Sequence, residues 1–470
     1  MLNRLKNVIM KRKLHCYFCA LFIGFSVGVY AQTDVTLIPD SNFEQKLIDL
    51  GYDDVLDGEV LTNSINTITS LDLQSANISD LTGIEDFTSL NFLYLYYNNL
   101  DEIDVSALTQ LKQLYLNGNN VSELDLSNNS LLKHLDITGN NLSSLDISNC
   151  SQLISLKAYN NNLSYLDISN NTSLTSLFLN NNSFTELTLS NSTLTGLFTE
   201  GNSLTSLDLS NLPSLNFLDC SNSGLTSLDV SNNPNLSILK CHNNDLTELD
   251  LSNNPDLGEL KCMDNALAEL DVSLCESIYT VDCSNNNLTA VNVSGASSAT
   301  TNMLFQFVCD NNQLTSVDFS ELGTDSVFKI SASNNNFSEV NLSNLDLSGY
   351  IQLDFTSNPD LTCILVDEGV SVDPIFLDID EQTELSPECT ALSVSEVDFE
   401  AVSIVNPVKD LLVIQLPESV EIHEVSLYNL SGQEILHASN SDIDVSSFSN
   451  GLYMAKIITN KGTLVKKILK

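Results

Sequence analysis

The chain has 470 residues, of which 61 are Asp or Glu and 18 are Lys or Arg, so its formal net charge is −43 at pH 7. This charge disfavours nucleic acids and anionic membranes as partners, because both attract proteins through clustered Lys and Arg. The hydrophobic content of 42% is too high for a disordered acidic tail, so most of the chain should fold.

The N-terminal segment differs from the rest of the chain. Basic residues at positions 4–13 precede an apolar run at positions 16–30. Together with the small residue Ala31 before Gln32, this pattern is typical of a secretory signal peptide over residues 1–31, cleaved between those two residues. The run is shorter than the ~20 apolar residues that a membrane anchor needs. We therefore expect an exported chain with no transmembrane segment in its mature part.

A leucine pattern repeats about every 21 residues from Ile68 to Leu361. Two adjacent copies are LSILKCHNNDLTELDLSNNPD, from Leu236, and LGELKCMDNALAELDVSLCES, from Leu257. A unit this short cannot bury its own apolar face, so about 14 coils should stack into a solenoid with one continuous core. The alternation L-x-[L/C] predicts a short strand in each coil, and these strands should form a parallel sheet. The second half of each unit predicts an extended segment on the opposite side, with little helix.

Two polar columns recur at fixed positions of the repeat. An Asn in the first half can satisfy backbone groups that a tight bend leaves without partners. An Asp in the second half can accept hydrogen bonds from the Ser-Asn turn after it, although stacked carboxylates could also bind calcium. Interruptions by Thr188 and Asn292 favour the hydrogen-bonding role, so we expect no metal. The columns are Asn98, Asn119, Asn140, Asn161, Asn182, Asn202, Asn244, Asn265 and Asn286, and Asp104, Asp125, Asp146, Asp167, Asp208, Asp229, Asp250 and Asp271.

Cysteines occupy one core position of five successive coils. A single-file ladder of thiols cannot surround a zinc ion, so we expect buried free thiols that behave as small hydrophobic side chains. Cys363 and Cys389 bracket a non-repetitive segment after the last repeat, where a disulfide could close the end of the solenoid. The ladder comprises Cys220, Cys241, Cys262, Cys283 and Cys309.

The 21-residue pattern closely resembles the bacterial leucine-rich repeats that are built from nested ten- and eleven-residue halves in exported proteins. The match covers residues 68–361. The run IPDSNFEQKLIDLGYDDVLDGEVLT resembles the N-terminal cap of that family. The resemblance implies a cap over residues 32–67, with a short helix over Phe43–Leu50 that covers the first coil. The segment that begins LTCILVD resembles the C-terminal closure of the family, over residues 362–390.

The tail follows a linker over residues 391–402. Short alternating apolar runs broken by Asn-Pro, Ser-Gly and Asn-Gly turns predict a small Ig-like β-sandwich over residues 403–470. The tail resembles the C-terminal sorting domain of the type IX secretion system of Bacteroidetes, although a generic adhesive sandwich is an alternative. The resemblance implies the type IX machinery as a partner, and a protein that is secreted or displayed on the outer membrane of a Gram-negative bacterium. Its landmarks are Asn406, Pro407, Gly432, Gly451 and Tyr453.

Outward-facing strand positions have no packing role, so the residues chosen there are informative. All six lysines between Leu47 and Val408 lie in or beside predicted strands, and aromatic residues gather there too. Exposed aromatics at coil spacing can anchor a protein partner or stack on sugar rings. Solenoid strands can also carry aromatics without any ligand. The expected binding residues are Tyr94, Tyr96, Tyr115, His134, Lys157, Tyr159, Phe178, Phe198, Lys240 and Lys261.

Catalytic signatures are absent from the sequence. The mature chain has four histidines, no Gly-rich phosphate loop and no His-containing metal motif. We therefore predict a non-enzymatic protein without a cofactor that recognises a protein partner through the sheet face. A glycan-binding surface protein and an inert structural spacer are the alternatives.

Overall fold

A computed structural model describes residues 34–190, 193–294, 305–320, 327–345, 347, 351–370, 376–389, 403–404, 408–415, 421–429, 434–449, 451–459 and 462–470. The predicted signal peptide with its cleavage site at Ala31 and Gln32 lies outside these residues, as does the linker over residues 391–402. Three of the sorting-motif residues also lie outside them: Asn406, Pro407 and Gly432.

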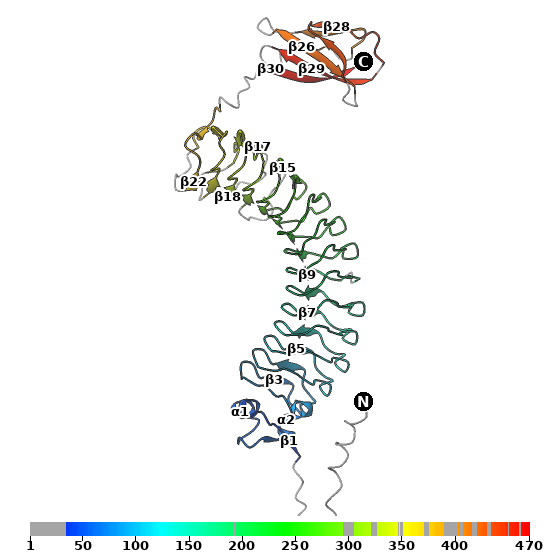
Figure 1. The fold of residues 1–470 in the computed structure, drawn as a ribbon, viewed down its shortest axis with the longest axis vertical. Coiled ribbons are helices and arrows are strands. Elements are labelled where there is room, and N and C mark those ends of the chain that lie inside the picture. The colour runs from blue at the N-terminus through cyan, green and yellow to red at the C-terminus, as the bar shows by residue number, and fades with distance from the viewer. Residues whose placement is uncertain are drawn as a thin grey trace, which may run out of the picture.

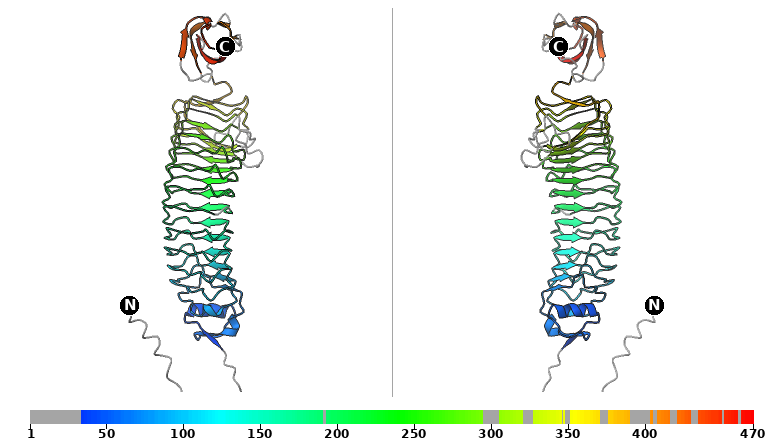
Figure 2. Two further views of the ribbon diagram at one scale, coloured as in Figure 1. Left: turned by 90° about the vertical axis from the view of Figure 1, so that its right-hand side faces the viewer. Right: turned by 90° about the vertical axis from the view of Figure 1, so that its left-hand side faces the viewer.

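The N-terminal cap combines an antiparallel pair of strands, β1 (Val35–Leu37) and β2 (Glu59–Leu61), with the helices α1 (Ser41–Asp49) and α2 (Thr62–Ile65). The predicted helix is confirmed, and it begins earlier than predicted because Asp40 caps it by accepting hydrogen bonds from the first backbone N–H groups. Asp40 also accepts the N–H groups of Ser79 and Asp80, which ties the cap to the first coil. The helix closes the end of the stack (Figures 1 and 2).

The solenoid core lies behind a parallel sheet of fifteen short strands on the concave side of the curved stack (Figure 1). Strands such as β7 and β8 bury their central residue, Leu156 or Leu177, and leave the residues on either side facing outward. This confirms the leucine-rich solenoid. The strands are β3 (Ser70–Asp72), β4 (Phe92–Tyr94), β5 (Gln113–Tyr115), β6 (His134–Asp136), β7 (Ser155–Lys157), β8 (Ser176–Phe178), β9 (Gly196–Phe198), β10 (Phe217–Asp219), β11 (Ile238–Lys240), β12 (Glu259–Lys261), β14 (Thr280–Asp282), β16 (Phe305–Val308), β18 (Val327–Ser331), β20 (Gln352–Asp354) and β22 (Leu377–Asp378).

The convex side carries strands only in the C-terminal coils that the structure describes. There, β13 (Glu269–Asp271) pairs with β15 (Ala290–Asn292), and a second sheet contains β17 (Ser316–Asp318), β19 (Glu339–Asn341), β21 (Cys363–Leu365) and β23 (Glu384–Ser386). Over the described earlier coils this half of the repeat forms no strand, and one 3-10 turn, η1 (Ile84–Asp86), lies in the first coil between β3 and β4. The prediction of a second extended segment therefore holds as a sheet only toward the C-terminus.

The Asn column forms a ladder of hydrogen bonds between coils, as predicted. Asn119, 6% exposed, accepts the backbone N–H of Leu100 and donates to the carbonyls of Leu95 and Leu116 at 3.0 and 2.8 Å. A second ladder, which the sequence analysis missed, runs through the opposite turn. Its Asn side chains are fully buried and donate to carbonyls 24 and 21 residues earlier. Its members are Asn129, Asn171, Asn233 and Asn254.

The Asp column lies on the convex side and has the predicted hydrogen-bonding role. Asp125 accepts the backbone N–H of Ser127 at 2.8 Å, and this bond, followed by the Ser127 hydroxyl, lowers the pKa of the carboxyl below its ordinary value of 3.8. The same Asp-x-Ser bond recurs along the column. Within the described ranges, no group of three His, Cys, Asp or Glu residues could hold a metal ion.

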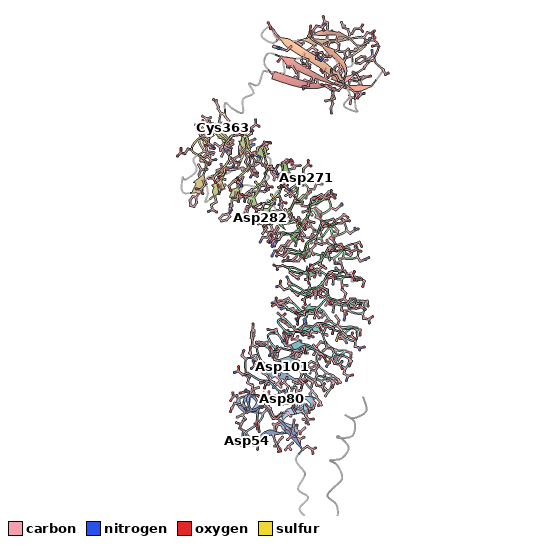
Figure 3. The ribbon with its side chains drawn as sticks, viewed as in Figure 1. Asp54, Asp80, Asp101, Asp271, Asp282 and Cys363 are labelled. Atoms are coloured by element: carbon pink, nitrogen blue, oxygen red, sulfur yellow. A yellow bond between two sulfur atoms is a disulfide. The ribbon has the colours of Figure 1, made fainter. Side chains whose placement is uncertain are left out.

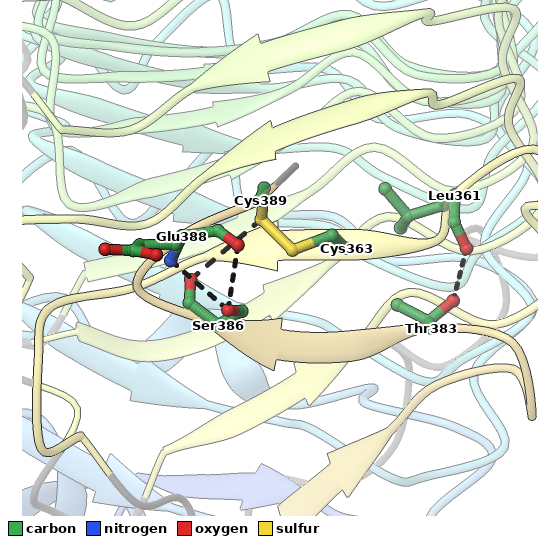
Figure 4. The surroundings of a disulfide bond; sticks show 6 residues. All are labelled: Leu361, Cys363, Thr383, Ser386, Glu388 and Cys389. Atoms are coloured by element: carbon green, nitrogen blue, oxygen red, sulfur yellow. Dashed lines mark hydrogen bonds between the residues drawn. A yellow bond between two sulfur atoms is a disulfide. The ribbon is translucent and has the colours of Figure 1, made fainter. Parts of the chain in front are cut away.

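The cysteine ladder is buried, as predicted. The thiols of Cys220, Cys241 and Cys262 are inaccessible to solvent and form no disulfide, and burial raises their pKa values well above 9.0. The predicted disulfide joins Cys363 on β21 to Cys389, which follows β23, the last strand of the solenoid (Figure 4). This bond covalently holds the end of the solenoid.

The C-terminal domain is a β-sandwich of two antiparallel sheets around one apolar core that includes Leu412, Val425 and Ile457. Gly451 exchanges two backbone hydrogen bonds with Lys470, and the Tyr453 hydroxyl donates to the Ser449 carbonyl at 2.8 Å. One sheet contains β24 (Ser403–Ile404), β25 (Leu411–Gln415) and β28 (Asp442–Asp444). The other contains β26 (Ile422–Tyr428), β27 (Glu434–Ala438), β29 (Leu452–Thr459) and β30 (Gly462–Leu469).

Candidate functional site

The parallel register places most of the predicted binding residues in one column of the concave face. Tyr94 pairs with Tyr115, and the register continues coil by coil to Lys261. His134 lies in the neighbouring column, whereas Tyr96 and Tyr159 follow the strands by two residues. All ten side chains are half-buried on the same side of the solenoid. The column comprises Tyr94, Tyr115, Asp136, Lys157, Phe178, Phe198, Asp219, Lys240 and Lys261.

Three phenylalanines in this face form what we call the phenylalanine stack: Phe178, Phe198 and Phe217. The rings of Phe178 and Phe198 are parallel within 7° with centroids 4.2 Å apart, and Phe217 is 4.6 Å from Phe198. The Lys157 ammonium lies 5.8 Å from the Phe178 centroid, and the Lys240 ammonium lies 5.2 Å from the Phe217 centroid. Each end of the stack is thus covered by a cation–π contact.

A glycine makes this arrangement possible. A Cβ atom at Gly196 would lie 3.2 Å from a carbon of the Phe198 ring, so the absent side chain leaves room for that ring to lean toward Phe217.

Farther along the face, the rings of Tyr94 and Tyr115 are stacked within 10° with centroids 5.2 Å apart. The rings therefore cover one another along the solenoid axis and present their edges to a ligand.

The lysines of this face mostly lack carboxylate partners. The Lys261 ammonium lies 3.1 Å from the Glu259 carboxylate. In the part of the chain that the structure describes, no ion pair involves Lys112, Lys133, Lys157 or Lys240. The two carboxylates within the column, Asp136 and Asp219, are 9% and 8% exposed and accept the backbone N–H groups of Thr138 and Ser221.

Acidic residues lie on both sides of the solenoid. Asp282 of β14, in the same register column, faces the concave side, whereas Asp271 of β13 belongs to the acidic column of the convex side (Figure 3). A shallow groove on the convex side is lined by Asp229, Asp250 and Asp271. Each of these carboxylates already accepts a Ser backbone N–H, so the groove follows from the repeat itself.

Tyr97 is a residue whose backbone conformation the sequence analysis missed. Its φ of 58° lies in the left-handed region, and its side chain is 64% exposed. The equivalent positions of other coils hold Gly, Asn, Asp or Ser, which tolerate this backbone better than Tyr. The ring lies against Gly118, where a Cβ would be 2.7 Å from it, and packs edge to face on Tyr96 at 5.8 Å. The unusual residue at a left-handed position was the signal that could have revealed it.

The sequence comparisons identify the tail. Residues 406–470 match the family model of the secretion system C-terminal sorting domain. This part of the chain is a sorting domain. It indicates export to the cell surface or secretion in Bacteroidetes, which confirms the predicted localisation. No helix among the described residues has the length and hydrophobicity to cross a membrane. No curated protein sequence matches the chain.

Solved structures support the solenoid fold. The functional domain of InlJ from Listeria monocytogenes, which includes a cysteine ladder, is 21% identical with a TM-score of 0.57, and the match covers 93% of this chain and 98% of that one. InlF, an internalin from the same organism, is 23% identical with a TM-score of 0.58, over 68% and 96% of the two chains. A leucine-rich-repeat protein of Leptospira interrogans is 19% identical with a TM-score of 0.50, over 63% and 85%. At these identities the likeness concerns the fold alone.

Proposed function

We propose that the exported solenoid recognises a protein partner through its concave face, without enzymatic activity and without a cofactor. The observation that supports this proposal best is the register column from Tyr94 to Lys261. Two pairs of half-buried rings occupy it, and each pair is followed by a nearly buried Asp and then by lysine. Aromatic side chains present a large rigid contact area at little entropic cost, so they are favoured as binding anchors. The solenoid fold, which the structural neighbours share, presents such side chains on one continuous surface.

The ring orientation favours a protein over a glycan. A sugar ring stacks on an open aromatic face, because its C–H groups meet the negative π-system. Both faces of Phe198 are covered by its neighbours, and the outer faces of Phe178 and Phe217 carry lysines. Ring edges and apolar side walls remain available, and these suit the side chains of a protein surface.

Binding to arrays of surface proteins and of polysaccharides tests the proposal with the full exported chain. The double change Tyr115→Ala and Phe198→Ala should weaken binding to a protein at least about tenfold, as expected for central aromatic anchors. Tyr165→Ala is the matched control, since Tyr165 is 69% exposed outside the main sheet. Saturable polysaccharide binding that the double change abolishes would favour the glycan alternative. Binding to neither array would favour an inert spacer.

The sorting domain makes a separate proposal testable. Deletion of residues 403–470 should leave the protein in the periplasm, because the type IX machinery would no longer recognise it. Cell fractionation with a protease-accessibility assay measures this directly. Unchanged delivery to the surface would contradict recognition by that machinery.

A further inference from the structure

We infer that the partner of the concave face is an acidic protein segment in extended conformation, with two carboxylates about six residues apart and apolar side chains between them. This inference rests on the proposed function, that the concave face binds a protein. Three independent features of the face lead to it: unpaired lysines, internally satisfied carboxylates and the geometry of the phenylalanine stack.

The first feature is the isolation of the lysines. The chain has 61 acidic residues and 18 basic residues, so there are more than enough carboxylates for every lysine to form an ion pair. Yet within the described ranges the ammonium groups of Lys112, Lys133, Lys157 and Lys240 form no ion pair. Lys157 and Lys240 end the strands β7 and β11 of the concave sheet, and Lys112 and Lys133 directly precede β5 and β6. Within the solenoid, this strongly acidic protein thus keeps unpaired lysines in and beside the strands of the concave sheet, where an external carboxylate can pair with them.

The second feature is that nearby carboxylates do not neutralise these lysines. Asp136 accepts the Thr138 N–H at 3.1 Å, and Asp219 accepts both the N–H and the hydroxyl of Ser221. Both carboxylates are nearly buried, so they face the turn rather than the ligand. Glu259 is paired with Lys261. The Glu200 carboxylate, two residues after β9, accepts hydrogen bonds from the Asn180 and Asn222 amides. Lys157 and Lys240 therefore remain as the unpaired charges at the two ends of the phenylalanine stack.

The third feature sets the spacing. Lys157 and Lys240 stand at the two ends of the phenylalanine stack, four coils apart on β7 and β11. At about 4.8 Å per coil, the two lysines are separated by about 19 Å along the solenoid, which is the length of about six residues of extended chain. Between the lysines the stack presents ring edges, which carry partial positive charge and suit carbonyl and carboxylate oxygens. An extended segment with an acidic residue at each end and apolar residues between fits this surface.

Selection from a displayed library of random 16-residue peptides tests the inference with the full chain as bait. Enriched peptides should be acidic, with carboxylates about six residues apart. They should bind Lys157→Glu/Lys240→Glu at least about tenfold more weakly, as expected when a charge pair becomes a repulsion. The matched control is Lys46→Glu/Lys409→Glu, which makes the same change in net charge on the cap helix and in the C-terminal domain, away from the concave sheet. Its affinity should stay within about twofold of the original.

The outcomes separate this inference from the proposed function. Neutral or basic peptides that lose binding with Phe198→Ala but not with Lys157→Glu/Lys240→Glu would overturn the acidic partner and leave concave-face recognition standing. Peptides indifferent to both changes, or no enrichment, would contradict concave-face recognition as well. Binding of an acidic polysaccharide such as alginate that depends on both lysines, without acidic peptides being enriched, would also overturn the inference.

Discussion

The Asn ladder gives the sharpest test of what holds the coils together. Asn119→Ala removes three hydrogen bonds from a side chain that is 6% exposed. The Leu95 carbonyl still accepts Asn98, and the Leu116 carbonyl still accepts Asn140. Each lost bond to them should cost about 1 kcal/mol, while the orphaned Leu100 N–H costs a further 1–3 kcal/mol or so. We expect the free energy of unfolding to fall by about 3–5 kcal/mol.

Urea unfolding followed by far-UV circular dichroism measures this loss, because the chain has no Trp for fluorescence. The matched control is Asn120→Ala, one residue farther along the same turn, whose side chain is exposed. This control should change stability by no more than about 0.5 kcal/mol. Equal losses in the two variants, or a loss below about 1 kcal/mol for Asn119→Ala, would refute the role of the ladder.

Because burial raises the pKa of Cys241 and its neighbours, the seven free cysteines among the described residues should resist alkylation in the folded protein and react in urea; rapid native labelling would contradict this. Changing Cys363 and Cys389 to Ser should lower the free energy of unfolding by about 3 kcal/mol, as measured by urea titration, since the bond closes a 26-residue separation. The hydrogen bond from the Ser127 N–H lowers the pKa of the Asp125 carboxyl. The ionised carboxylate therefore stabilises the fold above about pH 4, and this stabilisation is lost as the pH falls through the lowered pKa. The Tm of the protein should decline between about pH 4 and pH 2. Tyr97→Asn should raise the free energy of unfolding by about 1 kcal/mol by relieving the left-handed backbone; a loss would mean that ring packing on Gly118 outweighs the strain.

Most structural features that follow directly from the 21-residue repeat could be predicted from the sequence. A 21-residue period places equivalent residues in equivalent environments, so the Asn and Asp columns and the buried cysteines could be read from spacing alone. The disulfide was expected for a different reason, because Cys363 and Cys389 bracket a non-repetitive segment after the last repeat. The second Asn ladder follows from the same logic and was missed, although Asn129 and Asn254 share one repeat position. The predicted binding residues remain predictions, although the structure places them on one face.

Features that depend on contacts between side chains were beyond the sequence. Nothing in the letters shows that Phe198 leans toward Phe217 over Gly196, because this depends on the lateral spacing of three coils. Nor does the sequence show that Lys157 and Lys240 lie over the two ends of the phenylalanine stack. On the convex side the sequence predicted an extended segment in each coil. It could not show that these segments pair as strands only toward the C-terminus, because the repeat pattern specifies burial there but not the pairing of the backbone.

The constant 21-residue offset between β10, β11 and β12 also bears on how this gene could change over generations. Excision of residues 237–257 would join Leu236 to Gly258, the same Leu-Gly step that the chain already contains at 257–258. Duplication of that stretch would be equally seamless. Recombination could therefore lengthen or shorten the protein by one rung, about 4.8 Å, at a time. A lineage could tune its reach to a new target without redesigning the interior.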